Sequence, residues 1–341
     1  MGAGKFKIVI IGAGAISQAA HVPAVLASPV ATLIGVVDPD VDRARALCHS
    51  FGVEAAVAAD VGRLGVEFDG AIVAAPNDLH APITLSLVQK GIPVLVEKPV
   101  ATSVDAAREL TRAADGKGVV VAVGYHTRFS GACRMLKHAI DSEQFGRVLR
   151  FAHQDGSRGG WSPLSGYNLD AKRAGGGVLV TTGTHFLDRL IWFWGSPAEV
   201  SFRDNASGGP ESHCIARFVF RNSDRDIAGS AIFSKVVALP EMTVVETTEG
   251  LLLMPSDAGE TITFRPNGDR LLEYEVRFAR SGHDPRKLYQ RELEDFIDAC
   301  RSGRKPCVDA GMATASLELL SRLYEARQPL HGSEMKEYSD G

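Results

Sequence analysis

The chain has 341 residues, of which 45% are hydrophobic and 23% are charged, so it is long enough for two domains with well-filled cores. Its formal net charge of -4 and its scattered lysines and arginines argue against nucleic acid or an anionic membrane surface as a partner. The five cysteines form no CxxC pair, which argues against a disulfide framework or a zinc ribbon and favours a reducing, cytoplasmic location.

From Lys7 to about Tyr125, short apolar runs alternate with helical patterns, which is typical of a parallel sheet covered by helices on both faces. Strands are predicted at residues 7–11, 31–37, 70–75, 93–97 and 119–124, with a weaker signal near residue 55. This first part of the chain is therefore predicted to be a doubly wound α/β domain.

The helix after the third of these strands carries its own start and stop signals. Asn77 and Asp78 are suited to cap a helix that runs through Lys90, with Pro82 in its first turn and Gly91 after its end.

A glycine-rich loop, Gly12 to Ser17, lies directly between a predicted strand and a predicted helix. Gly12 permits a tight turn and Gly14 lets the backbone approach a pyrophosphate, which the helix amino terminus stabilises. Ala15 and Ile16 belong to the same predicted anion site, and Ser17 takes the place of the third glycine. We therefore predict that this loop binds a dinucleotide.

The second predicted strand ends on Asp38. A carboxylate at that point accepts hydrogen bonds from the adenine ribose hydroxyls and repels a 2'-phosphate, so NAD is favoured over NADP. Arg43 leaves two interpretations open, because its guanidinium suits either a cofactor phosphate or the carboxylate of Asp40.

Residues 92–99 read IPVLVEKP, a buried strand pattern that stops on Glu97, Lys98 and Pro99. Open α/β sheets bind ligands at the carboxyl ends of their strands, where the Lys98 ammonium is placed to polarise a substrate oxygen. An ordinary solvated lysine at a strand end is the alternative interpretation. Pro99 fixes the backbone behind the lysine, with a cis bond as one option.

Beyond about Arg128 the alternation ends, and helices are predicted at 131–140 and 178–194. Strand-like segments follow at 148–154, 198–202, 214–220, 226–233, 242–247 and 261–264, and two amphipathic helices at 288–301 and 310–327. Runs of strands without alternating helices indicate an antiparallel or mixed sheet in an α+β domain.

Seven segments together resemble the glucose-fructose oxidoreductase and inositol dehydrogenase family, Gfo/Idh/MocA. They are GAGAIS at 12–17, VVDPD at 36–40, APNDLH at 75–80, VEKP at 96–99, GYHTRF at 124–129, AGGGVLVTTGTHFLD at 174–188 and ELEDFIDACRSGRKP at 292–306. Their order and spacing cover nearly the whole chain.

The resemblance implies a Rossmann domain at 1–126, an α+β substrate and oligomerisation domain at 127–330 with a large, mostly antiparallel open sheet, and a polar tail at 331–341. The resemblance also implies a carboxyl-terminal helix that packs back on the Rossmann domain. Homodimers or homotetramers built through the open sheet are implied as well.

The chemistry that the resemblance implies is hydride transfer between a nicotinamide and a secondary hydroxyl or ketone of a sugar, a sugar derivative or a cyclitol, with no metal. In the family, the lysine of the EKP motif contacts the reacting oxygen and a later helical histidine accepts its proton. Lys98 and His185 match those positions, and an imidazole titrates near the working pH. Without the resemblance, the preferred interpretation of His185 is a helix histidine whose hydrogen bonds are satisfied by a neighbour.

One departure concerns the residue four positions before this histidine, where many family members have an aspartate and this chain has Thr181. The spacing keeps Thr181 and His185 on one helix face, so a neutral hydroxyl remains available there. Losing the carboxylate favours neutral His185 and leaves the substrate open. Asp188 is suited either to orient the His185 ring or to a structural role.

Other site candidates follow strand ends or lie in loops. The predicted cofactor contacts near the later strands are Ala75, Pro76, Asn77, His80, Glu97 and Lys98, although Asn77 also suits a cap. The predicted substrate contacts besides Thr181 are Tyr125, Arg128, Trp161, Tyr167, Asn168 and Arg173, the last four in a polar, glycine-rich stretch that equally suits a surface loop.

Two other functions stay open from the sequence. The missing aspartate is compatible with a regulator that binds a dinucleotide without catalysis, although Lys98 and His185 argue against it. An NAD-dependent glycosidase that works by transient oxidation uses similar chemistry, and the sequence alone does not separate it from a dehydrogenase.

Overall fold

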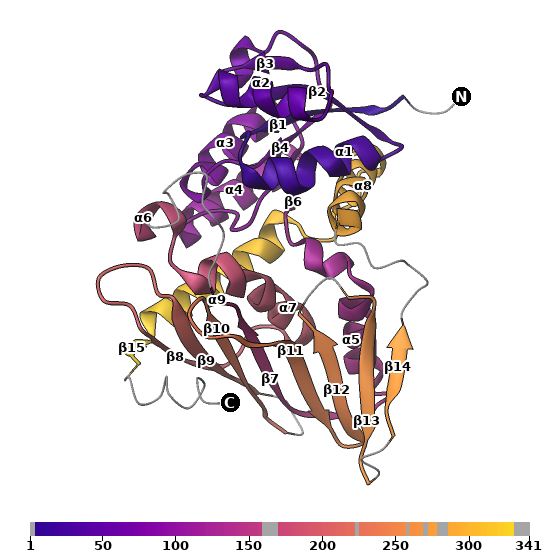
Figure 1. The fold of residues 1–341 in the computed structure, drawn as a ribbon, viewed down its shortest axis with the longest axis vertical. Coiled ribbons are helices and arrows are strands. Elements are labelled where there is room, and N and C mark those ends of the chain that lie inside the picture. Colours follow the sequence, from indigo (N-terminus) through magenta and orange to yellow (C-terminus); the bar gives the residue numbers. More distant parts are fainter. Residues whose placement is uncertain are drawn as a thin grey trace.

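The computed structural model describes residues 4–158, 170–221, 225–256, 259–268, 272–277 and 286–330. Figure 1 shows an amino-terminal domain around one sheet, a second and larger sheet below it, and helices packed between the two.

The amino-terminal sheet is parallel and doubly wound, as predicted. Its strands are β1 (Phe6–Ile11), β2 (Ala31–Val37), β3 (Ala56–Ala58), β4 (Gly70–Val73), β5 (Val94–Val96) and β6 (Val121–Val123). They lie in the order β3-β2-β1-β4-β5-β6, with every described pair parallel. Ile8, Val9 and Ile10 are fully buried, because helices cover both faces of this sheet.

The helices of this domain are η1 (Ser17–His21, a π-helical turn), α1 (Val22–Ala27), α2 (Val41–Ser50), η2 (Val61–Arg63), α3 (Asn77–Gln89) and α4 (Val104–Lys117). The predicted cap of α3 is wrong. The cap position is Pro76 without a side-chain hydrogen bond, and the Asn77 amide instead donates to the Ala174 carbonyl at 2.8 Å. Pro82 lies inside the helix, beyond its first turn.

The second sheet is large, open and mixed. Its strands are β7 (Val148–Gly156), β8 (Glu199–Asp204), β9 (His213–Phe220), β10 (Ile227–Ser234), β11 (Leu239–Thr247), β12 (Gly250–Pro255), β13 (Thr261–Pro266), β14 (Tyr274–Arg277) and β15 (Arg327–Pro329). In the described chain they lie in the order β14-β13-β12-β11-β7-β10-β9-β8-β15, with only β7/β10 and β8/β15 parallel. The predicted fold class is confirmed, while β12, β14 and β15 were not predicted.

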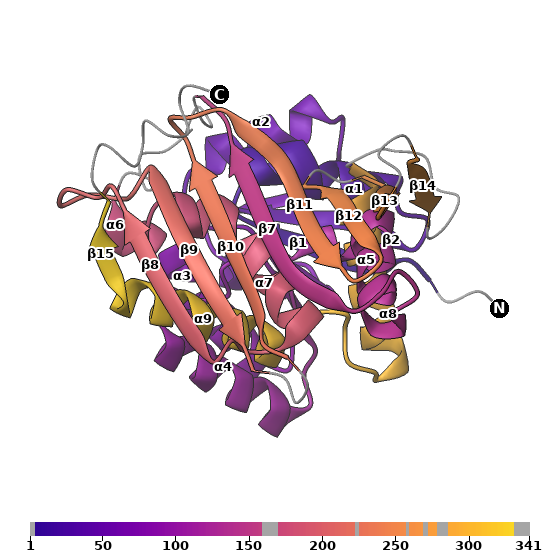
Figure 2. The same cartoon turned by 90° about the horizontal axis from the view of Figure 1, so that it is seen from below.

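Helices cover one face of this sheet and leave the other without helices, as seen from below (Figure 2). The second domain contributes η3 (His126–Phe129), α5 (Gly131–Ser142), α6 (Ala171–Ala174), η5 (Leu179–Gly183, again π-helical), α7 (Thr184–Trp194), α8 (Arg286–Ser302) and α9 (Ala310–Glu325). The ring of Phe186 in α7 stacks on His153 of β7 with centroids 4.1 Å apart, so α7 sits directly on the sheet.

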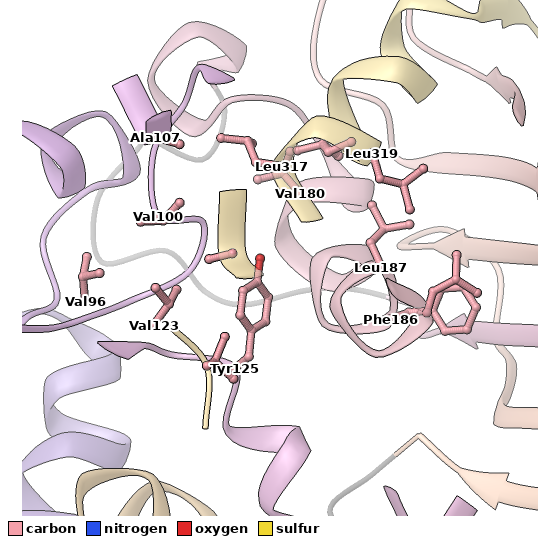
Figure 3. Packing of buried hydrophobic residues seen from close by; sticks show 14 of the residues in the cluster. Val96, Val100, Ala107, Val123, Tyr125, Val180, Phe186, Leu187, Leu317 and Leu319 are labelled. Carbon is pink, nitrogen blue, oxygen red and sulfur yellow. The ribbon is translucent and has the colours of Figure 1, made fainter. Parts of the chain in front are cut away.

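One hydrophobic core joins the two domains. Figure 3 shows buried side chains that run from Val96 and Val123 of the first sheet, past Leu317 of α9, to Leu187 of α7. Because dense packing has few alternative arrangements, this shared core fixes the strand ends of the first domain against helix α7 of the second.

Helix α8 returns to the amino-terminal domain and lies beside α1 (Figure 1). Its fully buried Phe296 meets the ring of Phe6 edge to face, with centroids 6.1 Å apart. The domain boundaries stay predictions, and the predicted tail at 331–341 lies outside the described residues. Across the described ranges, no helix combines the length and apolarity that crossing a membrane requires.

Candidate active site

A cavity of about 820 Å³ opens at the carboxyl ends of the first strands of the parallel sheet. Eight predicted cofactor residues line it, namely Gly12, Gly14, Ala15, Ile16, Asp38, Arg43, Ala75 and Pro76. The loop at 59–62 and the α3 side chains Leu79 and Ile83 also line it, and the sequence reasoning missed them. The site lies at the topological switch point, where doubly wound sheets bind nucleotides.

The glycine-rich loop has the geometry that an anion site needs. Gly12 adopts a φ of 105°, and a Cβ there would lie 2.3 Å from the Ala74 carbonyl oxygen. Gly14 has no heavy atom within 4 Å of its would-be Cβ, so a ligand is able to approach its backbone closely. Ser17 is buried and donates its hydroxyl to the Gly12 carbonyl at 2.5 Å, which fixes the turn.

Asp38 is held at the rim of this cavity by backbone groups. Its carboxylate accepts hydrogen bonds from the Ala13 and Asp40 N–H groups at 2.8 and 2.9 Å. The Arg43 guanidinium lies 3.4 Å from Asp38 and 3.3 Å from Asp40, so it pairs with both carboxylates. These residues fit a dinucleotide, whose ribose Asp38 would hold and whose phosphates the loop at Gly14 would hold.

Lys98 connects the parallel sheet to the second domain. It follows β5, its bond to Pro99 is cis, and its Nζ donates to the Thr181 carbonyl at 2.9 Å. Burial lowers the pKa of the Lys98 ammonium below its usual range; the negative charge of Glu97 opposes this effect and the positive charge of Lys235 adds to it.

His185 lies in the first turn of α7, just after the π-helical turn that contains Thr181. Its Nδ1 is buried without a hydrogen-bond partner in the described part of the chain. Burial, followed by the positive charge of Lys98, lowers the pKa of His185 well below 6.5. The imidazole is therefore neutral at neutral pH and able to accept a proton.

A series of rings that the sequence reasoning missed leads from His185 to the interior of the first domain. His185 contacts His126 with centroids 4.7 Å apart, and His126 stacks on Tyr289 at 4.2 Å. Tyr289 contacts His21 at 5.6 Å, and His21 Nε2 lies 2.9 Å from a Glu97 carboxylate oxygen. Of these, His126 stood in a recognised motif, whereas Tyr289 gave no local signal.

Two members of this series, His126 and Glu97, have strongly shifted pKa values. Burial lowers the pKa of His126 to about 4. Burial alone would raise the pKa of Glu97, but the hydrogen bond and charge of His21 outweigh it and lower that pKa to about 2. The series therefore holds a carboxylate at one end and neutral imidazoles near the other.

Four predicted cofactor residues, Asn77, His80, Glu97 and Lys98, do not line the cavity. Lys98 bonds to the Thr181 carbonyl, and the other three also bond to protein groups. Asn77 bonds to the Ala174 carbonyl. The two His80 ring nitrogens lie 2.7 Å from the Pro99 and Ala75 carbonyl oxygens. Glu97 bonds to His21 instead. Each residue therefore holds loops around the site in place.

Two predicted substrate residues, Arg128 and Arg173, form ion pairs with other residues of the protein. Arg128 is 2% exposed and forms a bidentate ion pair with Asp188, through contacts of 2.6 and 2.7 Å. This pair occupies Asp188, which therefore does not orient His185. Arg173 pairs with Asp78 at 3.1 Å and lines the dinucleotide cavity.

Tyr125 is buried, with its ring edge-to-face against His185 at 5.9 Å, so it packs beside the proposed base. Predicted substrate contacts that lie outside the described residues are Trp161, Tyr167 and Asn168.

Glu211 is a site residue that the sequence reasoning did not find. It is 2% exposed and accepts hydrogen bonds from the Gly177 and Leu179 N–H groups, at 3.1 and 3.0 Å, and from the Tyr324 hydroxyl at 2.8 Å. A Cβ on Gly177 would lie 2.1 Å from the Glu211 carbonyl oxygen, so glycine is needed for this approach. Glu211 thereby fixes the chain that carries Thr181 and His185.

Comparison with known proteins settles the family. Residues 6–125 match the GFO_IDH_MocA oxidoreductase family with its NAD-binding Rossmann fold, and residues 137–215 match the carboxyl-terminal alpha/beta domain of that family. The chain belongs to the Gfo/Idh/MocA family. It is an oxidoreductase that acts on CH–OH groups and has an NAD-binding Rossmann domain.

Relatives span nearly the whole chain. The rhizopine catabolism protein MocA of Rhizobium meliloti is 26% identical over 338 residues, covering 93% of this chain and 96% of that protein. The 1,5-anhydro-D-fructose reductase of Ensifer adhaerens is 26% identical, covering 87% and 89%. A levoglucosan dehydrogenase structure, in complex with NADH and levoglucosan, has a TM-score of 0.82 at 19% identity, covering 94% and 97%.

The position of helix α7 in this Gfo/Idh/MocA protein can be tested at Glu211. We expect Glu211→Gln to lower the free energy of unfolding by about 2 kcal/mol, because a buried carboxylate that accepts several hydrogen bonds is lost. We also expect kcat to fall about tenfold as His185 shifts. Urea unfolding and the rate of NADH formation measure the two effects.

Glu199→Gln is the matched control, because Glu199 pairs with Arg221 as Glu211 pairs with Arg327, but the Glu199 side chain is 62% exposed. This control should change stability by less than about 1 kcal/mol. If Glu211→Gln were as stable as Glu199→Gln, the anchoring role would be wrong.

Proposed function

We propose that the protein transfers a hydride between NAD and a secondary hydroxyl or ketone of a sugar, a sugar derivative or a cyclitol. Lys98 polarises the substrate oxygen and His185 acts as general acid and base. The observation that carries the proposal is the hydrogen bond from Lys98 Nζ to Thr181, one helical turn before His185. The charge of Lys98 also acts on His185, which supports a joint action of the ammonium group and the neutral imidazole on one substrate oxygen.

The two side chains have complementary roles. Lys98 has three N–H donors, and among the described residues only the Thr181 carbonyl accepts from one of them, so two are available for a substrate oxygen. As the hydroxyl becomes a carbonyl, neutral His185 accepts the hydroxyl proton. NAD held by the glycine-rich loop and Asp38 would supply the hydride acceptor, so that the two-electron oxidation of the alcohol would be balanced by reduction of NAD. In the reverse direction His185 returns the proton.

The substrate class is supported by what the relatives are named for. Anhydrofructose reductase and levoglucosan dehydrogenase are both named for cyclic sugar derivatives. A Thr181 in place of the aspartate expected from the resemblance leaves the identity of the sugar open.

We further propose NAD as the cofactor, and assembly as a homodimer or homotetramer through the open sheet. Asp38 supports the cofactor because its carboxylate stands at the end of β2, where it would repel a 2'-phosphate. The sheet face without helices in Figure 2 supports the assembly.

Removal of either catalytic side chain tests the proposed roles. We expect Lys98→Ala and His185→Ala each to lower kcat about 10²–10⁴-fold, because the oxygen loses its polarising donor or its proton acceptor. Absorbance of NADH with a panel of sugars and cyclitols measures this loss, and NAD affinity should remain close to wild type. Exposed Lys117→Ala is the control, and equal activity in all three variants would refute the assignment.

The pH profile gives a second test. His185 must be neutral to accept a proton, so alcohol oxidation is lost as pH falls through its pKa, which lies well below 6.5. Lys98 must carry its proton, so activity is lost as pH rises through its pKa, which lies below 10.5. We expect an acid limb with a midpoint below pH 6.5. An acid limb at or above that value, still present in His185→Ala, would contradict this role.

The cofactor preference is tested at Asp38. We expect Asp38→Ala to lower kcat/KM with NAD roughly 10-fold and to bring the NAD to NADP ratio of kcat/KM towards one, because the ribose acceptor and the repulsive charge are both removed. Asp42→Ala is the control, since that side chain is 90% exposed. A wild-type protein that prefers NADP would overturn the cofactor assignment.

A further inference from the structure

Arg189 is a buried cation that the described protein groups do not neutralise. It lies one turn after His185 on α7 and is 3% exposed. Among the described residues its guanidinium makes no hydrogen bond or ion pair, and its Nε is completely buried. A buried charge without a partner is costly, so this arginine does not contribute to stability in the ordinary way.

Arg128 shows the contrast within the same protein. It is equally buried, at 2% exposure, but it forms a bidentate ion pair with Asp188. In the part of the chain that the structure describes, one buried arginine is therefore paired with a carboxylate and the other is not, although Asp188 and Arg189 are neighbours in the chain.

Arg189 lies beside the proposed catalytic groups. His185 and Arg189 are four residues apart on α7 and therefore share one face of the helix. After burial and the charges of Lys98 and His126, the charge of Arg189 also lowers the pKa of His185. Arg189 therefore lies close enough to His185 for its charge to affect this proposed catalytic group.

A second cation near the proposed catalytic groups, Lys235, comes from the second sheet. Strands β7 and β10 are parallel, so Asp155 near the end of β7 and Lys235 just after β10 lie at the same edge. Burial and then Glu241 raise the pKa of Asp155, while Arg189 and Lys235 act in the opposite direction. Asp155 forms no ion pair with either cation in the described structure, and Thr181 adds no charge.

We propose that Arg189 binds an anionic group of the substrate, a carboxylate or a phosphate, so that the protein acts on an acidic sugar or cyclitol. A guanidinium fork matches either anion with two parallel hydrogen bonds, and Lys235 supplies a second positive charge at the same edge. The inference rests on the proposed function for the redox step and adds the chemical class of the substrate.

The first experiment compares two arginine-to-leucine variants by thermal unfolding of the full chain. Arg189→Leu should keep or raise the melting temperature, because it replaces an unpaired buried charge with an apolar side chain. Arg128→Leu should lower it by roughly 5–10 °C, because Asp188 is left buried and unpaired. An equal loss in Arg189→Leu would show a structural role and overturn the proposal.

The second experiment measures binding to the NAD-loaded protein by titration calorimetry. The probes are D-gluconate for a carboxylate, D-glucose 6-phosphate for a phosphate, and D-glucitol as the neutral polyol. We expect at least one acid to bind wild type more than 10-fold tighter than glucitol, and Arg189→Leu to weaken that acid roughly 100-fold. Arg189→Lys should retain part of the affinity, since a point charge replaces the fork.

The outcomes separate this inference from the proposed function. Acids that bind no tighter than glucitol, or equally well to Arg189→Leu, would overturn the inference. NADH formation from neutral sugars that requires Lys98 and His185 would then leave the proposed function standing. Acid binding that requires Arg189, without NADH formation from any probe, would support the inference and count against the proposed reaction.

Discussion

The hydrogen bond between the Lys98 ammonium and the Thr181 carbonyl is the contact on which the rest of the site depends. It joins the end of a parallel strand to the start of the helix that carries His185, across 83 positions of sequence. This hydrogen bond requires that both Lys98 and the segment carrying Thr181 are held in fixed positions. Pro99 and Glu97 fix the lysine side through bonds to His80 and His21, and Glu211 fixes the helix side through the Gly177 and Leu179 N–H groups.

Burial is the physical cause of the chemistry assigned to this site. It lowers the pKa values of His185, His126 and Lys98, because each charged form loses its hydration. The fold compensates only some of the buried charges, most clearly in the Arg128 and Asp188 pair. Arg189 has no ion-pair partner within the described ranges, and we propose that its charge binds the substrate.

The sequence predicted what short segments determine by themselves. The parallel sheet, the Gly12 turn and the position of Asp38 follow from local patterns and appear in the structure. Residues brought together from distant segments could not be found this way, because Tyr289 and Glu211 meet the site only through α8 and the loop before β9. Arg128 misled the prediction, since residue type and motif gave no sign of its buried partner. The short strands β14 and β15 were not predicted, because four and three residues give little periodicity.

The central claim is that Lys98 and His185 share one substrate oxygen. A crystal structure of the protein with NAD and a sugar or cyclitol that it oxidises tests it most directly. The account predicts a substrate hydroxyl oxygen about 3 Å from both Lys98 Nζ and a His185 ring nitrogen, with its carbon facing the nicotinamide. A substrate hydroxyl that faces the nicotinamide but contacts neither side chain would contradict the account.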